Sequence, residues 1–490
     1  MIDRLYSFCL PCLKLLFTAI LTGVFGSCST PKKIPLTIAT TQLPDALHSS
    51  YPTDSLHTGS ISWRKYFLDT ILVRHIEEAL QVNADLIQAV ARVSQSKAQY
   101  LAATGALLPS LQVRGRAGGE RFGKYTMNGV GNFDTNLSER ISDDQRVNEN
   151  FTPDFFLAFE SSWELDVWGK LRQARKARQL EILASEEGLH LIKTMIVTTI
   201  AELYFTLQAL DDEREIIENE LKLQKDGLEK TKILKSSGRT TELAVKQFEA
   251  QILNTEALLR KVLIEINATE NAINTLKMQP PGPVKRNQEL FDASMDSTIV
   301  LSTPLQLLFN RPDIRQSEAL LRAAGADLNA ARLAFFPQLT VNPFIGLNAF
   351  KSNLFLNPAS LAFAAFGNGI IPIFQQNQLK ANYRFQNARL QQAQAEYQKS
   401  IVNALNEVNT NLVSFEEYLK ISKIKGEETS TLKISESVAN ELFLNGYVTY
   451  LDLLTVRREV LKTQLEHVEA TLNRKIARVR LYQSLGGGWF

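Results

Sequence analysis

Two long stretches without proline constrain this chain more than any other feature. No proline lies between Pro153 and Pro280, and none follows Pro372. Proline interrupts helices because it lacks an N–H donor and its ring clashes with the preceding turn. If residues 171–237 form one helix, a rise of about 1.5 Å per residue makes it about 100 Å long. Such rods far exceed the three or four turns of a typical globular helix. Spacing of four and three residues predicts a coiled-coil seam within the first rod, at Ile196, Ile200, Leu203, Leu207 and Leu210.

The first half opens with an expected amphipathic helix from about Ile71 to Ala106. Segments with strand-like alternation then precede each rod. In the first half, residues 110–122 and 154–168 alternate apolar and polar side chains. This alternation over about ten residues is typical of a transmembrane β-strand, although a half-buried strand of a soluble sandwich has the same pattern. The apolar positions are Leu111, Val113, Gly115, Ala117, Phe155, Leu157, Phe159, Trp163, Leu165 and Val167.

The same order of segments occurs twice, which indicates an internal duplication. Leu107-Leu-Pro109 before the first strand is matched by Phe335-Phe-Pro337 in the second half. A long helical hairpin follows each strand pair, turning near Gly238 and again near Gly446, about 208 residues later. We expect a first repeat over 63–283, a linker or equatorial segment over 284–303, and a second repeat over 304–490 with strands near 336–350 and 360–374.

The junction between the last strand and the second rod differs from its counterpart in the first half. Gln375-Gln-Asn377 stands where the first half has Gly169. Asparagine tolerates the left-handed backbone conformation that glycine adopts freely. The bend at this junction is therefore expected to persist.

These segments predict an α+β membrane protein with long helical hairpins and four membrane-spanning strands per chain. No apolar run after residue 30 approaches the ~20 residues of a membrane-spanning helix. Four strands cannot close a cylinder, and an open sheet edge in lipid costs several kcal/mol for each unpaired group. Three copies would supply twelve strands, wider than the eight whose side chains fill the lumen. This architecture favours a conduit over an enzyme.

The N-terminus resembles the signal of a bacterial lipoprotein. An apolar stretch, Leu13–Val24, ends in Phe25-Gly-Ser-Cys28, with small residues before the cysteine. This pattern predicts a signal peptide over residues 1–27 and acylation of Cys28. An ordinary signal peptide cut near Ser27 is the alternative. Residues 28–62 would then form a lipid-anchored, extended arm.

The cysteine distribution supports this interpretation. Cys9, Cys12 and Cys28 are the only three cysteines of the chain. Once Cys28 is acylated, the mature chain could form no disulfide, thiolate metal site or cysteine nucleophile. Ser29 follows Cys28, and the absence of aspartate there favours sorting to the outer membrane.

Composition gives little support to nucleic-acid binding or to catalysis. The formal charge is +2, and 44% of the residues are hydrophobic. No glycine-rich loop has a phosphate-binding pattern, and acidic pairs such as Glu186-Glu187 and Asp211-Asp212 are interpreted as solvated helix faces. We therefore expect no nucleic-acid partner, catalytic residue, cofactor or metal. The histidines are scattered without metal-ligand spacing: His48, His57, His75, His190 and His467.

Several motifs together resemble those of TolC-like outer-membrane efflux proteins, in particular the lipidated branch that works with resistance-nodulation-division pumps. Their order and spacing carry the resemblance over nearly the whole mature length. The motifs are Leu107-Leu-Pro109, Ser162-Trp-Glu-Leu-Asp-Val-Trp-Gly-Lys-Leu-Arg172, Arg311-Pro-Asp-Ile-Arg315, Ala334-Phe-Phe-Pro337, Ile371-Pro-Ile-Phe374, Tyr450-Leu-Asp-Leu-Leu454 and Leu485-Gly-Gly-Gly-Trp489.

The resemblance implies a homotrimer with a twelve-stranded β-barrel in the outer membrane and a twelve-helix α-barrel in the periplasm. Small molecules (drugs, toxic compounds or metal ions) would leave passively through this duct. An inner-membrane pump would supply the energy. A periplasmic adaptor would dock on the hairpin tips at Gly238 and Gly446.

The resemblance also implies a periplasmic gate on the helix that follows Gly446. The family's constriction consists of a leucine, an acid and an arginine, of which Leu451 and Arg458 are matched here. Thr455 occupies the acidic position, so Asp452 or Glu242 would have to supply a carboxylate. Seam packing for Leu451 and a solvated helix flank for Arg458 are the alternatives.

Two other functions remain compatible with parts of the pattern. A periplasmic adaptor or coiled-coil scaffold would also contain long hairpins, but usually one hairpin between soluble β-domains. A type I secretion duct for polypeptides would share the fold. The lipoprotein signal and the segment around Arg311 favour the pump-linked branch.

Overall fold

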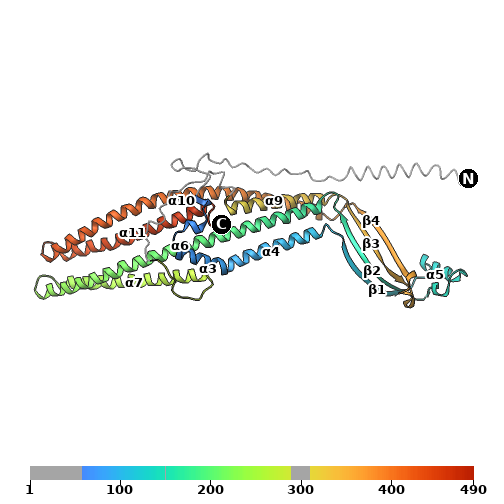
Figure 1. Ribbon diagram of the computed structural model, residues 1–490, viewed down its shortest axis with the longest axis horizontal. Coiled ribbons are helices and arrows are strands. Elements are labelled where there is room, and N and C mark those ends of the chain that lie inside the picture. Colours follow the sequence, from blue (N-terminus) through green and yellow to red (C-terminus); the bar gives the residue numbers. More distant parts are fainter. Residues whose placement is uncertain (1–57, 149, 288–309) are drawn as a thin grey trace. The chain divides into compact units, whose positions relative to one another are not determined.

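The computed structural model describes residues 58–148, 150–287 and 310–490. The expected signal peptide, Cys28, most of the arm and residues 288–303 of the linker lie outside these ranges. The described residues fall into two compact units (Figure 1). One contains residues 96–148, 150–181 and 321–393, and the other contains residues 58–95, 182–287, 310–320 and 394–490.

A four-stranded antiparallel sheet forms the first unit, with its strands in sequence order (Figure 1). Its strands are β1 (Ser110–Glu120), β2 (Thr152–Leu165), β3 (Gln338–Ala349) and β4 (Leu361–Ile370). β4 ends before Phe374, where the sequence analysis expects its end, and Pro372 has no N–H to donate to a ladder. Within one chain, β1 and β4 are the edge strands.

The predicted alternation gives the sheet one apolar face. Side chains in a single cross-strand row of this face are between 51% and 76% exposed. The row consists of Val113, Phe159, Ile345 and Phe363. An apolar face this exposed has no partner within the described part of one chain.

The opposite face of the sheet carries charges that pair across strands. Arg114 Nε lies 2.8 Å from Glu160 Oε2, and Arg116 pairs with Asp154. On the same face, Gln338 Nε2 donates to Glu164 at 2.8 Å. The apolar face is therefore as predicted, whereas the opposite face is mixed, because Phe156, Phe344 and Phe366 also lie on it.

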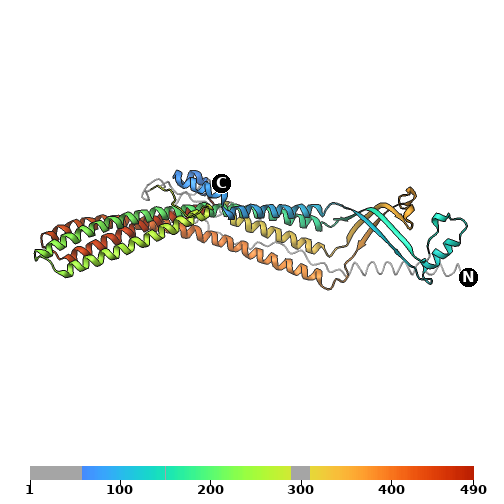
Figure 2. The ribbon, with the colours of Figure 1, turned by 90° about the horizontal axis from the view of Figure 1, so that it is seen from below.

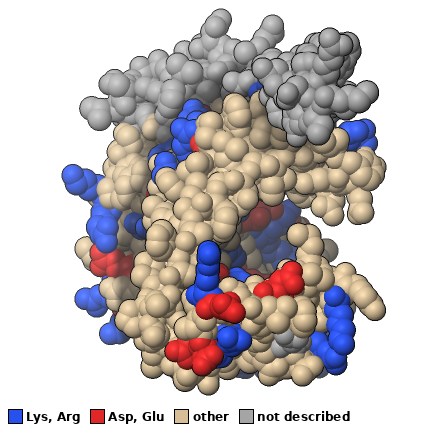
Figure 3. Space-filling model, turned by 90° about the vertical axis from the view of Figure 1, so that its right-hand side faces the viewer, with Lys and Arg blue, Asp and Glu red and all other residues tan. Residues whose placement is uncertain are grey.

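The loops between paired strands account for the main difference between the repeats. The β1–β2 loop contains helix α5 (Met127–Leu137) and the turn η2 (Asp143–Gln145). The β3–β4 loop contains only the short turns η4 (Ser352–Leu354) and η5 (Pro358–Ser360). No helix is predicted from the sequence between β1 and β2, but Thr126 caps α5 by accepting from Gly129 N at 3.1 Å. Basic and acidic side chains are interspersed on the face shown in Figure 3.

The two helical hairpins have the same dimensions. α6 (Lys170–Ser236) and α7 (Glu242–Leu276) contain 67 and 35 residues. α10 (Gln378–Leu444) and α11 (Tyr450–Ser484) also contain 67 and 35 residues. All four boundaries of the second hairpin lie 208 residues after their counterparts, as Gln378 follows Lys170. The predicted duplication is therefore confirmed.

Shorter helices connect these elements. The turn η1 (Thr58–Ser60) and α2 (Trp63–Tyr66) precede α3 (Thr70–Val82) and α4 (Ala84–Gly105), and α9 (Pro312–Leu333) precedes β3. The single helix expected from Ile71 to Ala106 is divided at Asn83, whose Oδ1 accepts from Asp85 N at 2.9 Å. No helix in the described ranges combines the length and apolarity needed to span a membrane.

The bend before α10 persists as predicted. Asn377 has a φ of +64°, close to the +86° of Gly169. The N–H of Ala381 donates to the Asn377 carbonyl at 2.8 Å, and Gln173 donates to the Gly169 carbonyl at 2.9 Å. Both rods therefore begin after a left-handed residue, and the second junction contains an additional one, Gln376, with a φ of +46°.

Apolar packing holds the two hairpins together in the second unit. The predicted seam of α6 is buried, and Leu461 of α11 joins the cluster formed by α6 and α7. Figures 1 and 2 both show the ends of the two hairpins side by side. The seam consists of Ile196, Ile200, Leu207 and Leu210, with Leu203 partly buried.

Candidate functional site

The ends of the two hairpins share one turn geometry. Gly238 and Gly446 have φ values of +76° and +82°. Arg239 N donates to Leu234 O at 2.9 Å, and Tyr447 N donates to Leu442 O at 2.9 Å. This bond, donated by the residue that follows the left-handed glycine, defines a Schellman motif. The turns therefore lie where glycine and asparagine predict them.

The N-terminus of α11 is closed by a capping box. Asp452 Oδ2 accepts from the backbone N–H of Thr449 at 2.8 Å and from its hydroxyl at 2.6 Å. The hydrogen bonds to Thr449 lower the pKa of Asp452 below its usual value. Asp452 is thus engaged in a contact within its own hairpin.

The other predicted gate residues lie on an exposed face of α11. Leu451 is 53% exposed, and the Thr455 hydroxyl donates to the Leu451 carbonyl at 2.8 Å. Arg458 is also exposed, and in the described ranges it has no carboxylate within 4 Å. Positions 451, 455 and 458 share one helix face because their spacing is four and three residues.

Arg458 lines a groove between α6, α7 and α11. The cavity has a volume of about 420 Å³. Three of its ten lining residues are leucines: Leu258, Leu461 and Leu465. The remaining lining residues are Glu213, Gln251, Asn254, Lys462, Glu466 and Glu469.

Glu242, the other predicted carboxylate, is engaged locally at the first hairpin turn. It pairs with Lys235, and the hydrogen bond from that lysine lowers the pKa of Glu242. Thr241 precedes it as the helix cap of α7 and accepts from Ala244 N at 3.4 Å. The structure does not bring Glu242 or Asp452 to Arg458.

The sequence analysis missed Arg457, which is buried beside the predicted gate. Only 8% of this residue is exposed. It occupies the apolar stripe of α11 between Leu454 and Val460, at three-residue spacing on each side. A charged residue within such a stripe is the sequence signal that identifies it.

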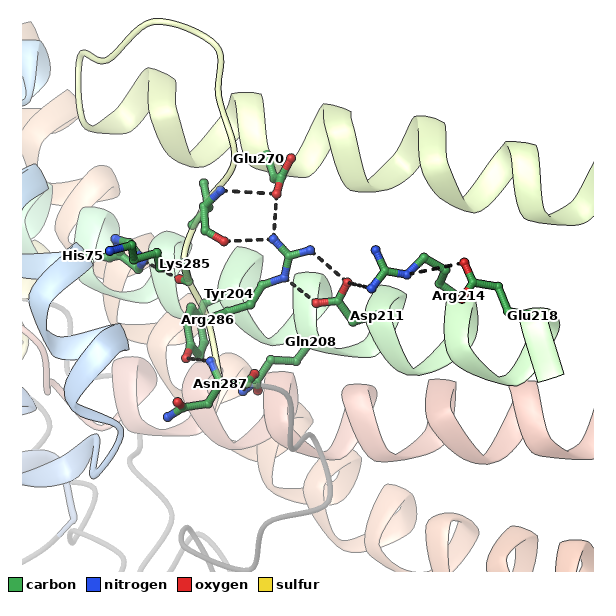
Figure 4. Close-up of polar contacts among 11 residues, drawn as sticks. His75, Tyr204, Gln208, Asp211, Arg214, Glu218, Glu270, Lys285, Arg286 and Asn287 are labelled. Atoms are coloured by element: carbon green, nitrogen blue, oxygen red, sulfur yellow. Dashed lines mark hydrogen bonds and ion pairs between the residues drawn. The ribbon is translucent and has the colours of Figure 1, made fainter.

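A polar network fixes the start of the expected linker to both helices of the first hairpin (Figure 4). Arg286 pairs with Asp211 on α6, and its Nη1 lies 2.6 Å from Glu270 Oε1 on α7. The backbone N–H of Asn287 donates to the Tyr204 hydroxyl at 3.0 Å. Asp211 is only 8% exposed, so the prediction of a solvated face at Asp211-Asp212 is wrong.

The second predicted acidic face is also partly buried. Glu187 is 8% exposed, pairs with Arg315 and accepts from His190 Nδ1 at 3.3 Å. The His190 ring stacks on Trp489 with centroids 4.4 Å apart. Glu187 therefore joins α6 to α9, and His190 joins α6 to the C-terminal segment.

Two acids beside Asp211 have raised pKa values. Burial raises the pKa of Asp212 to about 6, and Glu215 and Asp211 add to this effect. Burial likewise raises the pKa of Glu213 to about 7, with contributions from Glu265 and Glu469. In the described ranges, no group of three His, Cys, Asp or Glu residues could hold a metal ion.

Known proteins with this arrangement are outer-membrane efflux components. The family model described as "Outer membrane efflux protein" matches residues 75–276 and 303–487. The cation efflux system protein CusC of Escherichia coli O6:H1 is 27% identical over 428 residues, covering 87% of this chain and 88% of CusC. The solvent efflux pump outer membrane protein SrpC of Pseudomonas putida is 26% identical over 441 residues, covering 89% of each chain.

Solved structures support the same fold. The CmeC outer membrane channel of Campylobacter jejuni matches with a TM-score of 0.81 at 20% identity, covering 94% of this chain and 95% of that chain. At this identity the likeness is evidence for the fold alone.

Proposed function

Because the chain belongs to the outer membrane efflux protein family, we propose that it is the exit duct of a tripartite efflux system. It conducts small molecules passively from the periplasm to the outside and carries out no chemical reaction. The exposed apolar face of the four-stranded sheet is the observation that carries this proposal. A row such as Val113, Phe159, Ile345 and Phe363 suits a lipid environment, while the charged face suits a water-filled lumen.

The free edges of the sheet support a trimer. β1 and β4 each have one unpaired edge within the chain. In lipid, these edges are satisfied only when they pair with neighbouring copies. Three copies supply twelve strands, enough to leave an aqueous lumen.

The proposed partners are a periplasmic adaptor and an inner-membrane resistance-nodulation-division pump. The adaptor contacts the hairpin tips at Gly238 and Gly446. Relatives named for cation and solvent efflux indicate that one duct design serves different cargoes. The cargo of this chain is accordingly proposed only as small molecules: drugs, toxic compounds or metal ions.

The proposed gate consists of Leu451, Thr455 and Arg458 from each protomer. In the trimer, the three leucines would form an apolar ring, and the arginines would flank it. Substitution of both Leu451 and Arg458 by serine should raise single-channel conductance and uptake of a large antibiotic. Unchanged conductance and uptake would remove these residues from the gate.

Acylation of Cys28 is proposed to anchor the chain in the outer membrane. A Cys28→Ser variant should lose incorporation of radiolabelled palmitate, because no other cysteine lies beyond residue 28. Labelling that persists in this variant would exclude Cys28 as the lipidation site.

Planar-bilayer recording tests the proposed conduction. The wild-type protein and the Leu451→Ser/Arg458→Ser double variant should each be extracted from outer membranes in mild detergent. They should then be reconstituted in separate bilayers. Discrete conductance steps, larger in the variant, are the expected result. A correctly folded preparation in which neither protein conducts ions would overturn the duct function.

A further inference from the structure

We infer that Arg457 is the positioning residue that holds the two hairpins of one protomer together near their tips and keeps the gate closed. The gating part of this inference rests on the proposed function. Arg457 itself contacts no cargo, so it acts by positioning the α11 face that carries Leu451 and Arg458.

The Arg457 guanidinium contacts both hairpins. On its own hairpin, Nε lies 3.4 Å from Glu436 Oε1 of α10. On the other hairpin, Nη1 donates to the Leu223 carbonyl of α6 at 3.4 Å. Arg457 Nε has no hydrogen-bond partner, since Glu436 approaches only as an ion pair. Both contacts are longer than those of a bidentate arginine–carboxylate pair. The link between the hairpins is therefore weak enough to open.

Gly227 provides the space for this link on α6. A Cβ built at Gly227 would lie 3.0 Å from Arg457 Nη1 and 3.2 Å from the Phe248 ring. Glycine in a helix interior costs about 1 kcal/mol relative to alanine, so its presence calls for a packing reason. A methyl group at this position would require the guanidinium or the ring to move by a few tenths of an ångström.

The charges around Arg457 also come from both hairpins. Glu436 belongs to α10, and Glu220 belongs to α6, where it is 6% exposed and accepts from Gln224 Nε2 at 2.9 Å. Burial is the largest cause of the raised pKa of Glu220, whereas Arg457 lowers it. If the hairpins separate, Arg457 remains beside Glu436, whereas Glu220 and the Leu223 carbonyl of α6 lose the nearby guanidinium.

The neighbouring Arg458 is a matched control for the tip distances. Consecutive residues on a helix point about 100° apart, so one arginine faces the helix interface while the other faces the groove. Arg458 is exposed and forms no ion pair with the described residues, whereas Arg457 is buried between helices. Loss of charge is equal in the two variants, but loss of the link occurs only at Arg457.

Distances between the hairpin tips test the link directly. Cysteines introduced at the exposed positions Arg239 and Tyr447 would carry spin labels in the detergent-extracted protein. Pulsed electron–electron double resonance should show a longer and broader distribution of the distance between the two labels in Arg457→Gln and Gly227→Ala than in Arg458→Gln. Arg457→Lys, which retains the charge, should fall between wild type and Arg457→Gln.

Conductance provides the second readout. Arg457→Gln and Gly227→Ala should raise single-channel conductance several-fold over the wild-type chain. Tip distances and conductance equal in all variants would overturn the inference, as would a widening caused by Arg458→Gln alone. If Arg457→Gln does not assemble, Gly227→Ala decides the outcome, since it retains the arginine.

The two readouts separate this inference from the proposed function. Tip distances report the link whether or not the protein conducts ions. Widened tips without any conductance would support the link and contradict the duct. Conductance in wild type with unchanged tip distances in the variants would support the duct and contradict the link.

Discussion

At the residue scale, left-handed backbone positions end all four long helices of the second unit's hairpins. Gly238, Gly446 and Gly486 occupy three of these positions, and Met278 occupies the fourth with a φ of +53°. Met278 precedes Gly486 by the same 208 residues that separate the repeats. A side chain in this conformation costs about 1 kcal/mol. The two repeats therefore end their second long helices with the same backbone conformation, but only the first repeat, at Met278, carries this strain.

Substitution of Gly446 tests this requirement for glycine. A Cβ there would meet no atom within 4 Å, so strain from its positive φ is the sole expected cost. Gly446→Ala should lower the local opening free energy of the turn by about 1 kcal/mol, measured by hydrogen exchange at Tyr447. Gly105→Ala is the control, since its Cβ is equally unhindered and its φ is not positive. Equal exchange in both variants would contradict this account.

Glu213 makes stability depend on pH. Its folded pKa of about 7 lies above its usual value because of burial, so the folded state binds more protons than the unfolded state between these values. This contribution to stability is present at low pH and is lost as pH rises through about 7. The free energy of unfolding of Glu213→Gln should therefore exceed that of wild type at pH 8, by on the order of 1 kcal/mol after solvent screening. At pH 4 the two values should be nearly equal.

Glu218→Gln is the control for this effect, because Glu218 lies on the same helix with a side chain 55% exposed. Denaturant titrations at both pH values provide the free energies of unfolding. A gain in Glu213→Gln that is the same at pH 4 and pH 8 would exclude titration of Glu213 as its cause.

The residue scale also marks the limit of sequence-based prediction. The motif around Leu451 identifies a region of α11 but not which neighbouring arginine is buried. Arg457 and Arg458 have the same chemistry, and only packing against α6 and α10 distinguishes them. Asp211 is a similar case, because its partner Arg286 lies 75 residues away.

At the element scale, period-two alternation predicted the sheet because it depends only on local geometry. The helical rods were predictable for the same reason, since the absence of proline and the seam spacing are local patterns. α5 was missed because its sequence, rich in glycine and asparagine, has a low helix propensity. The division at Asn83 was missed because Asn83 Nδ2 bonds to the distant Leu276 carbonyl at 3.0 Å.

The two faces of the sheet should respond differently to a charge. Leu157 lies on the apolar face opposite Gly115 and Leu347, and a lysine there should cost about 2–4 kcal/mol in lipid. Leu157→Lys should therefore greatly reduce the amount of folded protein in outer membranes, measured by heat-modifiable migration. Asn342→Lys adds the same charge on the polar face and should fold at near wild-type levels. Similar losses in both variants would contradict the lipid-facing assignment.

At the scale of the whole molecule, the duct requires closure by other copies of the chain. One chain leaves the edges of β1 and β4 unpaired and an apolar sheet face exposed. The duplication gives each chain two hairpins and two strand pairs, so a trimer provides six of each around one axis. Family membership supports this assembly, and the arrangement of strands within one chain explains why it is needed.

The detergent-corrected mass of the protein extracted from outer membranes tests this account most directly. Light scattering during size-exclusion chromatography in mild detergent separates the protein mass from the micelle. The account predicts about three times the 55.0 kDa chain mass, less three signal peptides. A monomeric mass, or release from membranes without detergent, would contradict it, because four strands alone cannot form a closed duct.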